Sequence, residues 1–336
     1  MLSHRNLVAN TIQTRVWFAD LREGKEVALG VLPFSHSYGL TACLNLAILT
    51  GSAVVLIPTF DAEGILKAIR RYHPTVFPGV PAIYAAINEF PSVRDYEVAS
   101  VKACISGASP LPVEVKEGFE KLTKGRLVEG YGLTEASPAT HANPLFGMSK
   151  VGTIGIPLPS TDARIVHPRT GRELGPGTIG ELLIRGPQVM QGYWHRPEET
   201  EEALRDGWLH TGDLAQMDGD GFFRIINRAR DLIPVGTRWV YPRDVEEVLY
   251  EHPAVQTAAA IGVPGASGRG EVRVHVVLRP GHQAAADEII AFCRGRLRSY
   301  QVPRQIRFRE QLPRSFVGKV LRQQLVAEEL AAEEGR

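Results

Sequence analysis

Three short segments combine glycine turns with side chains that could bind a nucleotide. In the first, EGYGLTEASP, an aromatic ring, a hydroxyl and a carboxylate lie within five residues of one another. The ring of Tyr131 can stack on a flat base, and the hydroxyl of Thr134 can reach a phosphate oxygen. The carboxylate of Glu135 can hold a Mg²⁺ ion that neutralises phosphate charge. Taken alone, such a segment is equally typical of an ordinary turn.

The second segment, GWLHTGDLA, places Asp213 directly after Gly212 in a predicted tight turn. Such a turn would present two carboxylate oxygens to neighbouring sugar hydroxyls, which is a common way to recognise a ribose. The alternative is an aspartate that accepts hydrogen bonds from the amides of its own turn. In isolation this segment favours the alternative.

The third segment, LPRSFVGKVLRQQL, carries Lys319 after Gly318, where a predicted flexible loop enters the last helix. A lysine on a hinged loop can move into a site and stabilise charge that develops on a phosphate or carboxylate. Most lysines in proteins are only solvated, and this segment alone does not distinguish the two cases.

The order of these segments along the chain is informative. They occur together with SGASPLP, GELLIRGPQVMQGYW and NRARDLI, and in this order the sequence resembles the adenylate-forming superfamily. That superfamily includes acyl- and aryl-CoA synthetases, luciferases and peptide-synthetase adenylation domains. LPFSHSYGL and VYPRDVEEVLYEHPAV look most like fatty acyl-CoA synthetases. The resemblance extends over essentially the whole chain.

The resemblance implies a role for each matching residue. Residues that would bind the nucleotide are Gly107, Ala108, Ser109, Tyr131, Gly132, Asp213 and Arg228. Of these, residues 107–109 would border the adenine, Tyr131 would stack on it, and Asp213 with Arg228 would hold the ribose. Residues implied in catalysis are Lys319, Thr134, Glu135 and His36. Lys319 would stabilise adenylate formation, Thr134 would contact the α-phosphate, and Glu135 would hold Mg²⁺. His36 would line the path to the acyl pocket, or else be a buried, hydrogen-bonded histidine.

The activity implied by the resemblance is that of an AMP-forming acid–thiol ligase. ATP would activate a medium- or long-chain fatty acid to acyl-AMP, and coenzyme A, as a substrate, would then take the acyl group. A hinge at Arg230 would rotate the small domain between the two steps. Two alternatives stay open. One is an adenylation domain that loads a carrier protein, and the other is a non-catalytic remnant or half of a split enzyme that binds AMP or an adenylate.

The pattern of apolar residues predicts the helices and strands that would position these candidate site residues. Up to about residue 150, apolar runs alternate with amphipathic helices, which predicts a parallel sheet covered by helices on both faces. Ser3 is predicted to cap a helix from His4 to Ala19, with Leu7, Ile12 and Val16 facing inward. Residues 151–229 read as short strands between turns, a β-rich subdomain. We therefore expect an α/β fold in which a partial adenylation domain, 1–229, is followed by a small mobile α+β domain, 230–336, whose last helix begins at Lys319.

One family feature would lie upstream of this sequence. Family members carry a Ser/Thr/Gly-rich loop, ending in Pro-Lys-Gly, immediately before a segment like MLSHRNLVAN, and its amides cradle the β- and γ-phosphates. Loss of about three charge-assisted hydrogen bonds costs on the order of 5–9 kcal/mol. We therefore expect this chain alone to adenylate poorly. We also expect exposed apolar surface, suited to a missing N-terminal half or a partner chain.

The composition excludes several other partners. Lys and Arg number 38 against 37 acidic residues, so the chain has no general attraction to nucleic acid or to an anionic membrane. We find no apolar run of membrane-spanning length, and the first residues lack the pattern of a signal peptide. The expected protein is cytoplasmic, without a transmembrane segment, and its partners are a small-molecule carboxylic acid and CoA.

Overall fold

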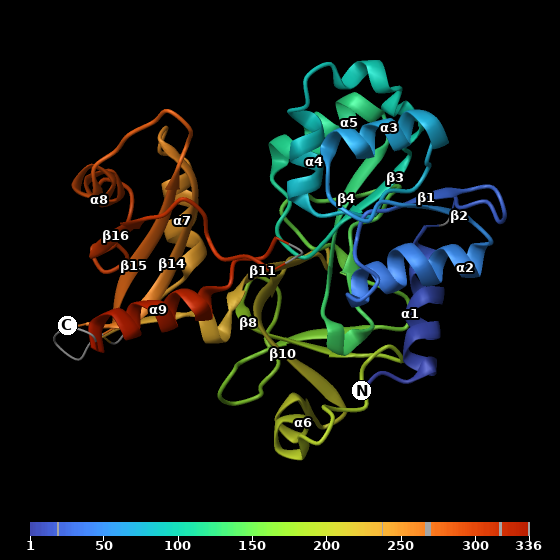
Figure 1. Cartoon of the computed structure of the whole chain (residues 1–336). Coiled ribbons are helices and arrows are strands. Elements are labelled where there is room, and N and C mark those ends of the chain that lie inside the picture. The colour runs from blue at the N-terminus through green and yellow to red at the C-terminus, as the bar shows by residue number, and fades with distance from the viewer. Residues whose placement is uncertain (19, 237, 266–269, 316–317, 335–336) are drawn as a thin grey trace. The chain divides into compact units, whose positions relative to one another are not determined.

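A computed structural model describes residues 1–18, 20–236, 238–265, 270–315 and 318–334 of the chain (Figure 1). The chain divides into two compact units. The first comprises Met1–Thr211 and Ala215–Ile225, and the second comprises Gly212–Leu214 and Ile226–Arg336. The first unit has the α/β architecture that the sequence predicts, and the second is the smaller α+β unit.

A parallel sheet forms the centre of the first unit. Its strands are β2 (Ala53–Leu56), β1 (Val27–Gly30), β3 (Ala103–Ser106) and β4 (Arg126–Gly132). Residues 76–79 lie between β1 and β3 and join them through single parallel bridges. Beyond β4 the sheet continues with the antiparallel strands β5 (Ala139–Ala142) and β6 (Ile156–Pro157). The carboxyl ends of the parallel strands therefore meet at one edge.

Helices cover both faces of this sheet because consecutive residues of its strands are apolar and their side chains point alternately to the two faces. Leu29, Phe77 and Leu127 point into a core formed with α3 (Ala62–Tyr72), α4 (Pro81–Asn88) and α5 (Val113–Thr123). Their neighbours Ala28, Val76 and Val128 belong to a second core that includes Phe18 and Leu46. On this side lie α1 (His4–Trp17), a π-helix (Gly39–Asn45) and α2 (Leu46–Thr50) (Figure 1).

The first helix, α1, has the predicted N-cap, but it buries a polar face and exposes the apolar face that was expected to be buried. The Ser3 hydroxyl accepts a hydrogen bond from the Asn6 amide, as expected of an N-cap. However, Ile12 and Val16 are 48% and 56% exposed, and the predicted inward apolar face is wrong. The buried residues are Asn6, Asn10, Thr11, Gln13 and Thr14. Their side chains bind backbone groups of distant segments: the Asn10 amide donates to the Ala139 carbonyl, and the Gln13 amide donates to the Pro159 carbonyl. The helix ends at Trp17, and Ala19 lies outside the described residues.

Exposed apolar side chains gather on the same elements. Besides Ile12 and Val16, Val8 on α1, Ile48 and Leu49 on α2, and Leu56 on β2 are exposed. Strand β2 pairs with β1 along one edge, and no other strand of the described residues pairs with it. The expectation of exposed apolar surface is thus met.

A second sheet makes the β-rich part. Its strand order is β11 (Phe223–Arg228), β10 (Trp208–Met217), β8 (Ile179–Arg185) and β7 (Asp162–Val166), and β9 (Leu204–Arg205) pairs with β10. A core of Ile165, Leu182, Ile184, Ala215 and Phe223 stabilises it. A single short α-helix, α6 (Pro197–Ala203), interrupts the described strands of this region.

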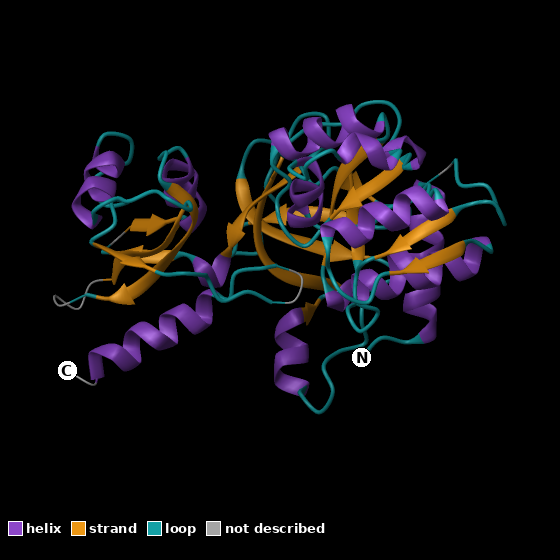
Figure 2. Cartoon of the chain, turned by 45° about the horizontal axis from the view of Figure 1, so that its top comes forward, coloured by secondary structure: helices purple, strands orange, loops and turns teal. Residues whose placement is uncertain are grey.

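The second unit is a sheet with helices on it (Figure 2). Strands β14 (Val255–Pro264), β15 (Gly270–Leu278) and β16 (Gln305–Phe308) form the sheet, with β12 (Ile233–Val235) and β13 (Arg238–Val240) as a separate hairpin. One apolar core lies under α7 (Pro242–Tyr250) and α8 (Ala286–Arg294), and another lies under α9 (Arg322–Glu334).

The last helix begins at Arg322, so its predicted start at Lys319 is wrong. Residues before it form a turn instead: the Ser315 amide donates to the Lys319 carbonyl, and the Lys319 amide donates to the Ser315 hydroxyl. Gly318 has φ +80°, a conformation that glycine adopts without strain and that ends helical geometry. Along the described part of the chain, every helix is too short or too polar to cross a bilayer.

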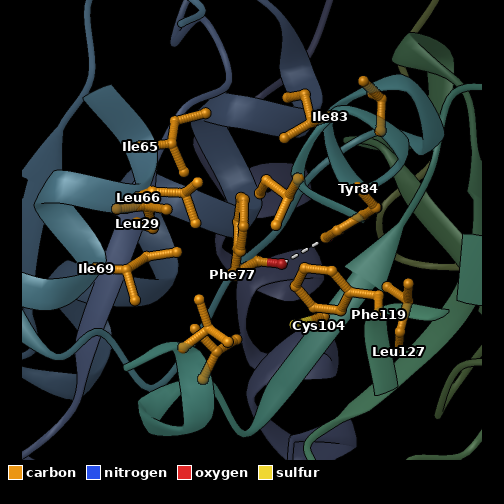
Figure 3. Close-up of a cluster of buried hydrophobic side chains, with 14 of the residues drawn as sticks. Leu29, Ile65, Leu66, Ile69, Phe77, Ile83, Tyr84, Cys104, Phe119 and Leu127 are labelled. Carbon is orange, nitrogen blue, oxygen red and sulfur yellow. Dashed lines mark hydrogen bonds between the residues drawn. The ribbon is translucent and has the colours of Figure 1, made fainter. Parts of the chain in front are cut away.

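We predict that Tyr84→Phe lowers the free energy of unfolding by about 1–2 kcal/mol. The Tyr84 side chain is fully buried and its hydroxyl donates to the Phe77 carbonyl at 2.7 Å and to the Ile105 carbonyl at 3.1 Å (Figure 3). The substitution leaves the Phe77 carbonyl without this donor in an apolar core, whereas the Ile105 carbonyl still accepts a hydrogen bond from the Tyr38 hydroxyl. Denaturant unfolding measures the change. Tyr72, which is 47% exposed, is the matched control, and Tyr72→Phe should change the value by no more than about 0.5 kcal/mol. Equal effects at the two sites would contradict the prediction.

Candidate functional site

The turn after β3 is shaped by a tyrosine that the sequence analysis did not single out. The Tyr38 hydroxyl donates to the Ile105 carbonyl at 2.6 Å and to the Gly79 carbonyl at 3.3 Å, at the carboxyl ends of two parallel strands. A Cβ atom on Gly107 would lie 3.1 Å from the Tyr38 ring, so the ring packs closely on this glycine. Ala108 follows with φ +68° and is exposed, and Ser109 is half-buried. The carboxyl edge of a parallel sheet is where α/β proteins bind ligands.

The turn after β4 folds the chain sharply back. A Cβ atom on Gly132 would lie 2.1 Å from the Pro138 carbonyl oxygen, so only glycine fits there. The Leu133 amide donates to the same oxygen, which closes the turn. This turn leaves Tyr131 half-buried, with its ring 6.1 Å from the ring of His141, and leaves Thr134 exposed. Burial lowers the pKa of His141 to about 3, so this packing histidine is neutral.

Residues 36–38 lie beside this second turn. The Ser37 and Thr134 hydroxyl oxygens are 3.4 Å apart, and the Thr41 hydroxyl donates to the Ser137 carbonyl. His36 is half-buried, its Nδ1 accepts a hydrogen bond from the Tyr38 amide, and burial lowers its pKa. The structure therefore brings His36, residues 107–109 and residues 131–135 to neighbouring strand ends. The role of His36 stays a prediction.

The Glu135 carboxylate has a partner that fixes its direction. The Tyr193 hydroxyl donates to Glu135 Oε1 at 2.8 Å, and burial together with the Glu135 charge raises the pKa of Tyr193 to about 12. Tyr193 therefore stays a protonated donor. Among the described residues no group of three or more His, Cys, Asp or Glu side chains could hold a metal ion by itself. A single carboxylate next to an exposed hydroxyl fits Mg²⁺ instead, since this ion keeps several waters and binds substrate phosphates.

A second group of predicted site residues belongs to the second unit. Asp213 is 4% exposed, and the Arg228 Nε atom lies 3.2 Å from its Oδ1 atom. The pair lies on neighbouring strands of the β-rich sheet, β10 and β11. Arg230 is in the short 3₁₀ turn (Ala229–Asp231) that follows β11. A charge-assisted contact of this kind holds the carboxylate in one direction.

Lys319 is surrounded by charged groups of this unit. Burial, the largest cause, and the charges of Arg228 and Arg230 together lower its pKa to about 8, and the charges of Asp213 and Asp231 oppose this shift. The loop is anchored close to the lysine, because Arg314 donates to the Gly318 carbonyl at 2.7 Å and to the Thr257 hydroxyl at 3.0 Å. Thr257 belongs to β14, so the backbone before Lys319 is tied to the central sheet of the unit. Residues 316–317 of the predicted flexible loop lie outside the described residues.

Sequence reasoning missed four residues that shape these groups: Ser37, Tyr38, Tyr193 and Asp231. All four lie inside the segments LPFSHSYGL, GELLIRGPQVMQGYW and NRARDLI that carried the resemblance. The motifs therefore contained the signal, but their spacing does not say which side chains touch across distant strands.

Comparison with known proteins places the chain in a family. A family model described as AMP-binding enzyme matches residues 1–194, and one described as AMP-binding enzyme C-terminal domain matches residues 244–319. This chain belongs to the AMP-binding enzyme family. It is 51% identical to a long-chain-fatty-acid–CoA ligase of Bacillus subtilis (strain 168), over 98% of this chain and 59% of that protein. It is 38% identical to a feruloyl-CoA synthase of Amycolatopsis sp., over 96% of this chain and 65% of that protein.

A solved structure agrees with this assignment. The crystal structure of ATP-bound MatB from Rhodopseudomonas palustris matches with a TM-score of 0.91 and 32% identity, over 98% of this chain and 64% of that one. The family and the adenylate-forming fold predicted from the sequence are thereby confirmed. The chain spans about 59% of the length of the long-chain-fatty-acid–CoA ligases that it matches.

We predict that the Lys319 amine titrates with a midpoint near pH 8. Burial disfavours the charged ammonium, so the proton is lost at a lower pH than from an ordinary lysine. NMR of a chain labelled with ¹³C at lysine Cε measures the midpoint, and the resonance is assigned by its loss in Lys319→Arg. Lys67 is an internal control, because its hydrogen bond to Glu63 raises its pKa. Midpoints that coincide for Lys67 and Lys319 would show that Lys319 is not desolvated.

Proposed function

We propose that this chain carries the nucleotide-binding and catalytic-lysine part of an AMP-forming fatty acyl-CoA synthetase. The observation that carries the proposal is its 51% identity, over nearly the whole chain, to a long-chain-fatty-acid–CoA ligase, against 38% to a feruloyl-CoA synthase. The higher identity favours an aliphatic acid of medium or long chain over an aromatic one. The site residues predicted from the sequence support the same chemistry.

Residues of the first unit would bind the base and the phosphate. The turn at residues 107–109 and the ring of Tyr131 border the adenine, and the exposed Thr134 hydroxyl contacts the α-phosphate. Glu135, directed by Tyr193, would hold Mg²⁺, which supplies positive charge to the phosphates when it is bound. Gly132 allows the turn that brings these side chains together.

Residues of the second unit would act on the ribose and on the reacting centre. Arg228 fixes the Asp213 carboxylate, and a fixed carboxylate can accept hydrogen bonds from ribose hydroxyls. The fatty acid carboxylate attacks the α-phosphate, pyrophosphate leaves, and the Lys319 ammonium stabilises the negative charge that develops. With a pKa of about 8, Lys319 is mostly protonated at neutral pH, so this stabilisation decreases as the pH rises through 8.

Thioester formation would follow in the same protein. The CoA thiol attacks the acyl carbon of acyl-AMP, and AMP leaves with the electron pair of the broken bond. Because AMP is already a good leaving group, this step needs positioning more than acid–base catalysis. Arg230, in the turn that follows β11, is the proposed hinge residue for the change between the two steps.

The test is a thermal-shift titration of the chain with non-hydrolysable acyl-adenylate analogues that carry two-, eight- or sixteen-carbon tails. We predict a rise in melting temperature that is larger for the longer tails, because their binding buries more apolar surface. Asp213→Asn should weaken the response to every analogue, since it removes the charge that is proposed to bind the ribose.

The matched control is Asp162→Asn. Asp162 is a surface carboxylate that pairs with Arg185 and is 61% exposed, so this variant should respond as the unchanged chain does. The proposal fails if no analogue raises the melting temperature, or if the two aspartate variants respond alike. A response to an aromatic acyl-adenylate that exceeds the response to every aliphatic one would move the substrate class to aromatic acids.

A further inference from the structure

Arg322 links three segments of the second unit. It is the first residue of α9 and lies three positions after Lys319. Its Nη2 atom donates to both carboxylate oxygens of Glu246, each at 2.8 Å. Its Nη1 atom lies 3.8 Å from Oδ2 of Asp231. The guanidinium therefore connects the entrance of α9 to helix α7 and to the turn after β11.

Glu246 is a rigid anchor for this arginine. It is buried in α7, and its Oε1 atom also accepts a hydrogen bond from the Ala260 amide of β14 at 2.8 Å. A carboxylate bound both to the sheet and to a forked guanidinium has little freedom to move. The position of Arg322 is thus set by the core of the unit.

Asp231 is the more weakly fixed of the two carboxylates. Its side chain is 9% exposed, its Oδ1 atom lies 3.9 Å from the Arg230 Nε atom, and its Oδ2 atom faces Arg322. It is also one of the groups whose charge acts on Lys319. Its carboxylate therefore has three cations around it, and where it points determines how much of its charge reaches the lysine.

We propose that Arg322 is a positioning residue, which draws the Asp231 carboxylate toward Glu246 and α7 and so keeps it from forming an ion pair with Lys319. A lysine in an ion pair with a neighbouring carboxylate cannot turn its charge toward a reacting phosphate. Arg322 thus keeps Lys319 available for adenylate formation. This role of Lys319 rests on the proposed function, whereas the effect of Arg322 on Asp231 does not.

The sign of the expected change follows from the charges that face Lys319. These are Arg228 and Arg230, which lower its pKa, and Asp213 and Asp231, which raise it. When Arg322 is removed, Asp231 loses one of its cations and Lys319 becomes the alternative partner. The Lys319 titration midpoint should therefore rise.

The experiment is the ¹³C lysine titration, performed on the full chain with Arg322→Gln, Asp231→Asn and the double variant. We expect Arg322→Gln to raise the Lys319 midpoint by about half a pH unit or more, the size expected for one charge that moves closer in a partly solvated site. Asp231→Asn should lower the midpoint. In the Asp231→Asn background, Arg322→Gln should change it by less than half as much. Arg322→Lys should restore the midpoint in part, because it keeps the charge but not the fork.

Arg309→Gln is the matched control for loss of a contact to α9. Arg309 donates to Glu328 of α9 and to His275 Nδ1, whereas the arginines beside Asp231 are Arg230 and Arg322, so loss of Arg309 should lower stability without moving the Lys319 midpoint. Melting curves of all variants measure how much stability each substitution removes.

Two outcomes would overturn the inference. One is an unchanged Lys319 midpoint in Arg322→Gln, together with a loss of stability like that of Arg309→Gln. The other is the same shift with and without Asp231. The proposed function is judged separately, by adenylate-analogue binding. If the midpoint moves as expected while no analogue binds, the positioning by Arg322 stands and the proposed function fails.

Discussion

The close approach of Gly132 to the Pro138 carbonyl is the constraint on which the first group of site residues depends. A Cβ atom at this position would lie 2.1 Å from the carbonyl oxygen, a distance that no side chain can occupy. With glycine, β4 can turn back on itself and pair with β5, so Tyr131, Thr134 and Glu135 leave the same sheet edge together. The hydroxyl contact between Ser37 and Thr134 is formed across this edge. The parallel register of β1, residues 76–79, β3 and β4 then fixes which other turns lie beside it.

In the second unit, the second group of candidate site residues depends on the charged side chains around Lys319. Burial and the charges of Arg228 and Arg230 lower the Lys319 pKa to about 8 against the opposing charges of Asp213 and Asp231, so the amine is mostly protonated at neutral pH. Each of these carboxylates has an arginine near it, Arg228 for Asp213 and Arg322 for Asp231. An isolated carboxylate next to Lys319 would instead form a simple ion pair. Under the proposed function, in which Lys319 acts on a substrate, carboxylates that are paired with arginines would offset part of the charge around the lysine without binding it in an ion pair.

Elements with strong local signals could be predicted from the sequence. The cap at Ser3 was expected because a serine side chain at this position can accept a hydrogen bond from a nearby amide, and the structure shows it. The alternation of apolar strands and helices likewise predicted the parallel sheet, since burial on both faces requires apolar runs.

Features that depend on distant contacts could not be predicted. The asparagines and the glutamine of α1 face inward because their side chains bind carbonyl groups more than a hundred residues away in the sequence. The local sequence pattern does not predict such contacts. The first residue of α9 is set by the hydrogen bonds between Ser315 and Lys319, which compete with helical ones. Tyr38, Tyr193 and Arg322 lay within quoted segments, but their partners lie in other segments of the chain.

Photo-crosslinking with an azido-adenine derivative of AMP tests the central claim most directly, because it reports where the base lies on the unaltered chain. If the carboxyl edge of the parallel sheet binds the adenine, mass spectrometry should find the modification on peptides that contain residues 107–109 or Tyr131, and excess AMP should suppress it. Modification confined to other peptides, or modification that AMP does not suppress, would contradict the account.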